Sequence, residues 1–372
     1  MSCGFSRGKK MSRELTIGSF SLGGTNPVRV ESMLKIPLSE KEKCLEQCLS
    51  LNREGCELIR VAFPSAESGE SLKWLNERSP VPLMADIHFD AGLALAALGA
   101  GVPSIRINPG NMPRTGVRDI VRSAREKKAV IRIGANGGSL SSRQIAEARG
   151  VRSDALASAV EDQLHLLLDE GFEDIILSAK STSVPETVRG NSLLSLKYPD
   201  FPFHIGITES GSGRDGLVKS AAGLAMLLAQ GIGNTLRISL TDTPEEEVRA
   251  GFSLLRALEM RAKGVNLISC PTCGRKRIDV RKLVDLLGPC IQSLPDGLSV
   301  AVMGCEVNGP REAMDADFGI AGSPGGAVIF SRGKVLKELP LEDLPSALLE
   351  LASDRRAEDG PENCRKKNEK GE

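Results

Sequence analysis

Three cysteines form the clearest candidate site for chemistry. Cys270 and Cys273 have two residues between them in Ser269–Arg275, and Cys305 follows the apolar run Leu298–Met303, which predicts a strand. A Cys-x-x-Cys turn can bind one metal centre with both thiolates, and a loop after a strand can add a third. Three thiolates with one further ligand are compatible with a 4Fe–4S cluster or with a zinc site.

The residues alone leave the metal open. Zinc ribbons usually have a second Cys-x-x-Cys at short spacing, which is missing here. The motif also lies outside the βαβ context of a thioredoxin-like redox pair. Cys290 is a spare thiol, but it follows a predicted helix end, where packing is its expected role.

A second chemical pattern is an arginine between two aliphatic residues, repeated in four predicted strands. Successive side chains of a strand face opposite sides, so the aliphatics are expected to face covering helices and the arginines the interior. The four segments are Ile59-Arg60-Val61, Ile105-Arg106-Ile107, Ile131-Arg132-Ile133 and Leu236-Arg237-Ile238. Guanidinium groups gathered at one strand end predict a site for several anions, and phosphate suits their geometry best.

The alternative interpretation is that interior carboxylates pair with these arginines. Glu31, Asp86 and Glu209 are available as partners. Lys180 and Lys219 are expected near the same site, so the basic side chains outnumber these three carboxylates. Both interpretations predict charged side chains at the same place, and the surplus favours the anion site.

Further polar residues end nearly every predicted strand, as a catalytic rim requires. They are Asp86, His88, Asn108, Asn111, Asn136, Ser178, Lys180, His204, Thr208, Glu209 and Ser239.

The elements that position these residues alternate between strands and helices. The expected strands are 28–32, 58–62, 82–87, 104–108, 130–134, 174–178, 201–207 and 235–240. Such alternation indicates βαβ units and a parallel sheet. Eight units predict a closed (β/α)8 TIM-type barrel. The alternative is an open doubly wound sheet, but no Gly-x-Gly-x-x-Gly follows the first strand.

The alternation stops after Lys263, where we place a domain boundary. We expect a flexible N-terminus at 1–12, the barrel at 13–263, a small α+β domain at 264–352 and a disordered charged tail at 353–372.

Composition excludes several functions. The chain has 372 residues, with 48 basic and 48 acidic residues, and aromatic residues make up 3% of it. Zero net charge and few aromatic residues argue against nucleic-acid binding. No apolar run reaches the length of a membrane helix, and no apolar signal segment follows the basic N-terminus. Nine unevenly spaced cysteines suit a reducing compartment, so we expect a cytoplasmic protein without membrane partners.

The motifs resemble those of the bacterial 4-hydroxy-3-methylbut-2-enyl diphosphate synthase family of the non-mevalonate isoprenoid pathway. The resemblance runs from about residue 13 to about residue 352. It rests on the two cysteine segments, including Val302–Pro310, and on barrel segments that include Ala85–Asp90, Ile105–Asn111, Gly206–Glu209 and Leu236–Thr241.

The resemblance implies a barrel followed by a 4Fe–4S domain with Cys270, Cys273, Cys305 and Glu312 as ligands. A carboxylate is harder than a thiolate, so Glu312 is expected to be the exchangeable ligand. The implied reaction opens the ring of 2-C-methyl-D-erythritol 2,4-cyclodiphosphate, with two electrons from flavodoxin or ferredoxin and loss of water. A homodimer is also implied.

Glu209 and Glu312 are the predicted catalytic residues; for Glu209, proton transfer and an ion pair with Arg237 or Lys219 are both open. The predicted substrate-binding residues are Arg60, Asp86, His88, Arg106, Asn108, Asn111, Arg132, Asn136, Ser178, Lys180, His204, Thr208, Lys219, Arg237, Ser239 and Asn308.

Three segments depart from the family pattern. The loop Leu34–Leu38 is apolar where the family is polar, and Ser181–Pro185 lacks the Asp and Tyr of the family. Arg311 stands where the family has Gly, which would cost about 1 kcal/mol if that residue were left-handed. These departures allow a divergent paralogue with a related substrate.

Two other function classes remain at this point. One is a non-redox, zinc-stabilised barrel enzyme that acts on a phosphorylated metabolite, with Lys180 as a Schiff-base residue. The other is an iron–sulfur sensor without enzymatic activity.

Overall fold

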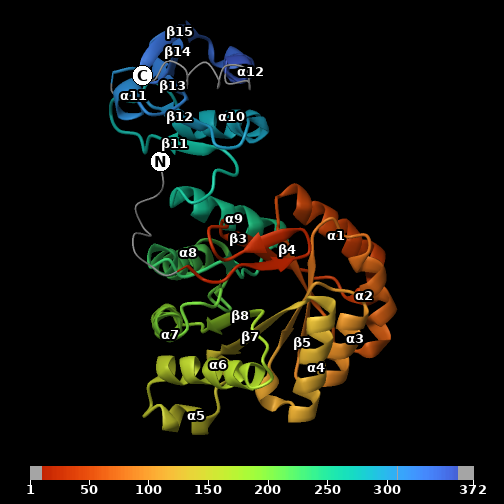
Figure 1. Ribbon diagram of the computed structural model, residues 1–372. Coiled ribbons are helices and arrows are strands. Elements are labelled where there is room, and N and C mark those ends of the chain that lie inside the picture. Colours follow the sequence, from red (N-terminus) through yellow and green to blue (C-terminus); the bar gives the residue numbers. More distant parts are fainter. Residues whose placement is uncertain (1–10, 308, 359–372) are drawn as a thin grey trace, which may run out of the picture. The chain divides into compact units, whose positions relative to one another are not determined.

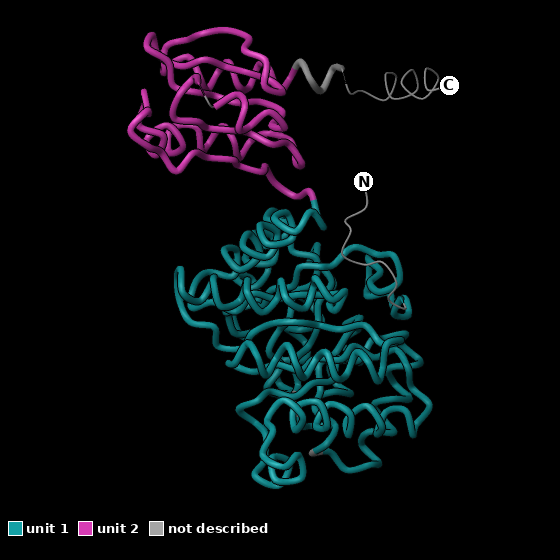
Figure 2. Tube along the Cα trace, turned by 90° about the vertical axis from the view of Figure 1, so that its left-hand side faces the viewer, with its two compact units in different colours: residues 1–261 teal, residues 262–372 magenta. Residues whose placement is uncertain are grey.

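The computed structural model describes residues 11–307 and 309–358. The chain forms two compact units, residues 1–261 and residues 262–372, which are coloured separately in Figure 2. No helix in the described residues is long and apolar enough to cross a membrane.

The first unit is the predicted (β/α)8 barrel (Figure 1). Its parallel strands have the order β8-β7-β6-β5-β4-β3-β10-β9. Its strands are β3 (Arg29–Met33), β4 (Leu58–Ala62), β5 (Leu83–His88), β6 (Ser104–Ile107), β7 (Val130–Asn136), β8 (Ile175–Lys180), β9 (His204–Ile205) and β10 (Thr235–Leu236). A parallel bridge between Leu177 and Phe203 joins β8 to the segment before β9 and closes the barrel. There the Leu177 N–H donates to the Pro202 carbonyl oxygen at 2.9 Å.

The last two barrel strands are shorter than predicted, at two residues each. Beyond them the ladder continues only through isolated bonds, such as that from the Arg237 N–H to the Ile205 carbonyl oxygen at 3.1 Å. Side chains there still alternate between apolar and polar, but this alternation does not require regular hydrogen bonding between the strands.

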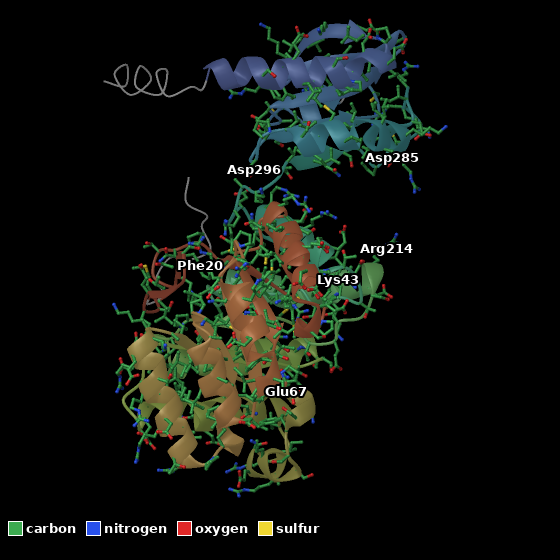
Figure 3. The ribbon with its side chains drawn as sticks, turned by 90° about the vertical axis from the view of Figure 1, so that its right-hand side faces the viewer. Phe20, Lys43, Glu67, Arg214, Asp285 and Asp296 are labelled. Carbon is green, nitrogen blue, oxygen red and sulfur yellow. The ribbon has the colours of Figure 1, made fainter. Side chains whose placement is uncertain are left out.

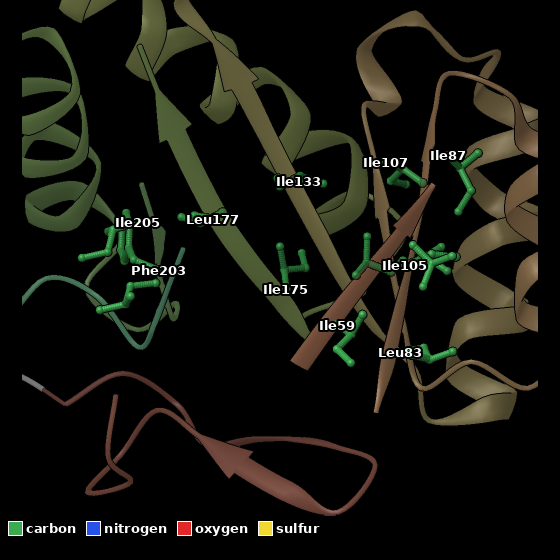
Figure 4. Packing of buried hydrophobic residues seen from close by; sticks show 14 of the residues in the cluster. Ile59, Leu83, Ile87, Ile105, Ile107, Ile133, Ile175, Leu177, Phe203 and Ile205 are labelled. Carbon is green, nitrogen blue, oxygen red and sulfur yellow. The ribbon is translucent and has the colours of Figure 1, made fainter. Parts of the chain in front are cut away.

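Helices cover the outside of the barrel. They are α1 (Lys41–Arg53), α2 (Gly69–Asn76), α3 (Ala91–Gly99), α4 (Arg114–Lys127), α5 (Ser142–Glu147), α6 (Arg152–Leu168), α7 (Val184–Lys197), α8 (Gly213–Ala229) and α9 (Pro244–Ala257). The strand residues Ile59, Ile105, Ile133 and Leu177 are completely buried in the core between strands and helices (Figure 4). The prediction that the aliphatics beside the arginines face outward is therefore confirmed.

An antiparallel hairpin, β1 (Leu15–Ile17) and β2 (Phe20–Leu22), precedes the barrel. Its apolar residues form one cluster with inward-facing residues near the strand beginnings. The barrel members of that cluster are Leu58, Met84, Val130 and Ile176. Two residues further along, the same strands present charged or polar side chains, so the interior has an apolar floor beneath a charged layer.

The second unit is the predicted small α+β domain. Its sheet has the order β11-β12-β13-β14-β15, with β11, β12 and β13 parallel and the last two strands antiparallel. The strands are β11 (Asn266–Ser269), β12 (Ser299–Met303), β13 (Phe318–Ser323), β14 (Gly326–Ser331) and β15 (Lys334–Leu339). Helices α10 (Val280–Ser293) and α12 (Leu344–Glu358) share an apolar core with the sheet.

Two details differ from the sequence predictions. Helix α10 continues through Pro289, so Cys290 lies inside the helix and packs in the core instead of following a helix end. Helix α12 ends at Glu358, so the first part of the predicted tail is helical.

Candidate functional site

A cavity of about 110 Å³ lies at the carboxyl ends of the barrel strands. It is lined by Arg60, Asp86, Arg106, Arg132, Ile133, Gly134, Asn136, Ser178, Lys180, Thr208, Arg237 and Ser239. All four patterned arginines and Lys180 therefore meet in one place. This is the end of the barrel where active sites of the fold lie.

Arg132 is the deepest of these cations, with 2% of its surface exposed. Its Nη1 donates to Glu31 on β3, which is also buried. Its Nη2 is buried and has no hydrogen-bond partner among the described residues. A buried donor without an acceptor is costly, so this nitrogen is available to an anionic ligand in the cavity.

Asp86 lies between two other arginines. Its Oδ2 is 3.6 Å from Arg60 Nε, and its Oδ1 is 3.3 Å from Arg106 Nη1. Arg60 also points Nε and Nη2 at the sulfur of Met33, at 3.2 and 3.0 Å. Burial is the main cause that lowers the pKa of Arg60 to about 10. One carboxylate shared by two guanidinium groups leaves positive charge uncompensated.

Arg237 pairs with a carboxylate that was not predicted from the sequence. Glu247, on α9, accepts hydrogen bonds from Arg237 Nε at 3.2 Å and from Nη2 at 3.2 and 3.3 Å. Glu247 also accepts from the Leu240 N–H at 3.2 Å and from Ser32 Oγ at 3.3 Å. The side chain of Glu247 is fully buried, and Lys35 Nζ lies 3.5 Å from it.

Glu209 was one of three carboxylates available to the arginines, with proton transfer and an ion pair with Arg237 or Lys219 both open. Glu209 is exposed, in a turn with a φ of +50°. Within the described part of the chain it forms no ion pair with Arg237 or Lys219. The carboxylate that pairs with Arg237 is Glu247.

Lys180 on β8 and His204 on β9 form a buried pair where these two strands meet. Lys180 Nζ lies 2.8 Å from His204 Nε2, and His204 Nδ1 lies 2.8 Å from Thr235 Oγ1. Burial, followed by the positive charge of Arg60, holds the pKa of Lys180 well below its usual value. Burial, followed by the charge of Lys180, lowers the pKa of His204 as well.

Some predicted residues lie elsewhere. Asn108 precedes the short 3-10 helix Pro109–Asn111 and lines a different cavity of about 620 Å³, together with residues of α5 and α6. Lys219 is half-buried on α8 and does not line the barrel cavity. The side chains of His88 and Asn111 and the whole of Asn308 lie outside the described residues.

In the second unit, Cys270 and Cys305 follow β11 and β12, which are adjacent and parallel. Gly304, the residue before Cys305, lies close to Cys270: a Cβ built on Gly304 would be 3.7 Å from Cys270 Sγ. The Thr272 N–H donates to Cys270 Sγ at 3.3 Å, and Thr272 adopts a φ of +68°. The turn predicted for the Cys-x-x-Cys segment therefore has a backbone N–H directed at a thiol sulfur.

Cys273 is exposed and lies beside Arg275. Hydrogen bonds from the Arg275 backbone and side chain lower the pKa of the Cys273 thiol, while the charge of Glu312 opposes this. Arg275 also interacts electrostatically with Cys305 and Glu312. Arg311, between helix residues of α11 (Gly309–Glu312), has no left-handed conformation, so the anticipated strain is absent.

The candidate metal donors of the second unit are Cys270, Cys273, Cys305 and Glu312. Within residues 11–307 and 309–358, no three His, Cys, Asp or Glu side chains are close enough together to hold a metal ion. The donor types nevertheless fit a thiolate-bound cluster. Cys270 and Cys305 follow neighbouring strands, and the Arg275 guanidinium interacts with Cys273, Cys305 and Glu312.

Fold and site together define a barrel protein with basic side chains in the cavity at its strand ends, followed by a cysteine-bearing α+β domain. Residues 12–252 match the GcpE TIM-barrel domain, and residues 266–354 match the GcpE protein C-terminal domain.

Relatives of similar length share much of the sequence. The chain is 44% identical, over 92% of its length and 96% of the relative, to a protein of Caldanaerobacter subterraneus subsp. tengcongensis. It is 41% identical to proteins of Thermodesulfovibrio yellowstonii and Geobacter sulfurreducens, over 92% of its length and 98% and 97% of theirs. All three are named 4-hydroxy-3-methylbut-2-en-1-yl diphosphate synthase (flavodoxin).

The chain therefore belongs to the GcpE family and is an oxidoreductase of the 4-hydroxy-3-methylbut-2-enyl diphosphate synthase type. Family membership favours this class over the non-redox zinc enzyme and the sensor.

Proposed function

We propose that this enzyme converts 2-C-methyl-D-erythritol 2,4-cyclodiphosphate to 4-hydroxy-3-methylbut-2-enyl diphosphate. The reaction takes up two electrons and one proton, breaks the ring C–O bond and releases water. The names of the relatives support the product and the class of electron donor.

The observation that carries the proposal is the unpartnered Nη2 of Arg132 in a cavity lined by five cations. A cyclic diphosphate presents two linked phosphates, and several guanidinium groups can bind it from different sides. We assign Arg60, Arg106 and Arg237 to the phosphate oxygens, and Arg132 to the deepest of them.

The polar rim supplies the remaining substrate contacts. We assign hydroxyl and phosphate recognition to Asn136, Ser178, Thr208 and Ser239, which line the same cavity. Lys180 lies at the base of the cavity, where His204 fixes its amino group.

We assign a 4Fe–4S cluster to Cys270, Cys273, Cys305 and Glu312 of the 264–352 domain. When bound, the cluster supplies the electrons for the reduction. Reduced flavodoxin is the proposed donor, with ferredoxin as the alternative. We further propose that the enzyme works as a homodimer in the cytoplasm.

Glu209 is the proposed proton donor. It comes directly after Thr208, which lines the cavity, and no ion pair with the described residues holds it in another role. Its exposure lets it exchange protons with water between turnovers. Glu209→Gln should lower kcat by about 100-fold, a typical contribution of general acid catalysis, while the KM for the cyclodiphosphate changes little.

The test of the function uses anaerobically purified protein. We expect about four irons and four sulfides per chain, broad absorption near 400 nm that bleaches on reduction, and turnover of the cyclodiphosphate with reduced flavodoxin. Cys305→Ser should abolish both colour and activity. Cys290→Ser is the matched control, because Cys290 packs inside α10. Full activity of a colourless protein would refute the proposal.

A further inference from the structure

A strongly basic segment follows directly after Cys273. Residues 275–282 contain five basic side chains and one acidic one, in a chain whose basic and acidic residues are equal in number overall. Arg275, Lys276, Arg277, Arg281 and Lys282 are all exposed. Such a local excess is not explained by the folding of the domain, because the buried residues here, such as Val280 and Leu283, are apolar.

The ion pairs of this segment are weak. Arg277 Nε lies 3.9 Å from Glu306, with 54% of its side chain exposed, and Lys282 Nζ lies 4.0 Å from Asp279, with 84% exposed. Pairs of this kind at the surface contribute little to stability. The positive charge is therefore presented to solvent.

The backbone holds this segment beside the thiols. The Arg277 N–H donates to the Gly304 carbonyl oxygen at 2.8 Å. A Cβ built on Gly304 would lie 3.5 Å from Lys276 Cβ, 3.5 Å from Val280 Cγ2 and 3.7 Å from Cys270 Sγ. The basic segment and the candidate cluster ligands thus share one end of the second unit.

We propose that this basic surface, formed by Arg275, Lys276, Arg277, Arg281 and Lys282, is the docking surface for the electron donor, a flavodoxin-type carrier with an acidic rim around its flavin. The proposal rests on the function proposed above. A surface close to the cluster ligands keeps the path from flavin to cluster short, and the reduced flavin gives one electron at each docking.

The charge pattern suits such a transient partner. Electron-transfer complexes bury small interfaces, so their association depends on charge complementarity and electrostatic steering more than on apolar contact. The exposed amino and guanidinium groups can steer an acidic partner without a preformed groove. The substrate's phosphates are assigned to the arginines of the barrel cavity, so the basic surface is not needed to bind them.

The test compares two reductants with the full-length enzyme loaded with its cluster. In Arg281→Gln/Lys282→Gln, we expect kcat/KM for reduced flavodoxin to fall by about fivefold at low salt, and the difference to vanish at high salt, where exposed charges are screened. Activity driven by reduced methyl viologen, a small molecule that needs no docking surface, should stay unchanged.

Two further variants sharpen the test. Lys334→Gln/Lys337→Gln removes the same charge from β15, at the opposite edge of the same sheet from β11, and should change neither activity. Asp285→Asn removes an exposed acid from α10, labelled in Figure 3, and should raise kcat/KM for flavodoxin, because Asp285 is one turn from Arg281.

Each outcome has a separate meaning. Unchanged flavodoxin kinetics in the α10 double variant, with viologen activity intact, would overturn the docking surface. An equal loss with both reductants would also overturn it, since the residues would then act on turnover. Absence of viologen-driven turnover in the unmodified enzyme would instead refute the proposed function.

Discussion

Replacing Glu247 with Gln should weaken both the barrel and its anion site. The carboxylate is fully buried and accepts from Arg237, Leu240 and Ser32, so it links α9 to β3 and to the segment that follows β10. Gln is nearly isosteric, but its amide nitrogen cannot accept a hydrogen bond and it has no charge to balance Arg237. A buried guanidinium that loses its partner charge costs about 3 kcal/mol, which corresponds to a Tm lower by about 6–12 °C for a barrel of this size.

The same change should disturb substrate binding. Glu247 accepts from Nε and Nη2 of Arg237, so the opposite edge of the guanidinium, with Nη1, is turned toward the cavity. With that anchor lost, we expect the KM for the cyclodiphosphate to rise by about tenfold, as for other small displacements of a positioned group.

The assays are thermal unfolding followed by circular dichroism, and steady-state kinetics with reduced methyl viologen. Glu246→Gln is the matched control. Its carboxylate is 47% exposed and pairs with Arg249 at the surface, so its loss should cost less than about 1 kcal/mol and leave KM unchanged. If Glu247→Gln behaved like Glu246→Gln, the role assigned to the buried carboxylate would be wrong.

Further predictions concern charge inside the barrel. The pKa of Lys180 is lowered from its usual 10.5, so between its folded and unfolded values the unfolded chain binds one proton more. The free energy of unfolding then rises with pH across that window, by at most about 1.4 kcal/mol per pH unit. Urea titrations of Lys180→Met should lose this slope, and an unchanged slope would contradict the assignment. Arg132→Gln leaves Glu31 buried without its guanidinium partner and should cost about 3–5 kcal/mol. Arg132→Gln/Glu31→Gln should recover much of that stability but not substrate binding. Recovery of a normal KM in the double variant would show that Arg132 does not bind the substrate.

The alternation of side chains made most of the barrel predictable. An arginine between two aliphatics has one low-energy orientation in a strand covered by helices, so Arg60, Arg106, Arg132 and Arg237 could be assigned to the interior without a structure. The closed barrel followed from the regular succession of strands and helices.

The carboxylate partners were harder to predict. Glu245, Glu246 and Glu247 are consecutive acids in the first turn of α9, a position where acidic residues are common because of the helix dipole. Only the rotation of the helix against β3 decides that Glu247 is buried. Glu209, two residues after the expected strand 201–207, was considered as a partner of Arg237, but it lies in a left-handed turn and is exposed.

Loop geometry explains the remaining differences. Asn108 and Asn136 both lie at strand ends. Asn108 leads into a 3-10 helix and lines the separate cavity of about 620 Å³, while Asn136 lines the barrel cavity. A sequence pattern fixes which face of a strand a residue occupies, but it does not fix the direction of the chain once the ladder ends.

The short strands β9 and β10 give the barrel an uneven mechanical stiffness. They have two paired residues each, and one bridge joins this side to β8, whereas β7 and β8 pair over six residues. Along this seam there are fewer hydrogen bonds between strands to resist bending. Amide hydrogens there should therefore exchange faster than those of β4–β7. Lys180, His204 and Arg237 lie along the seam. The part of the wall that yields most easily therefore has the side chains that must adjust when a ligand enters and leaves.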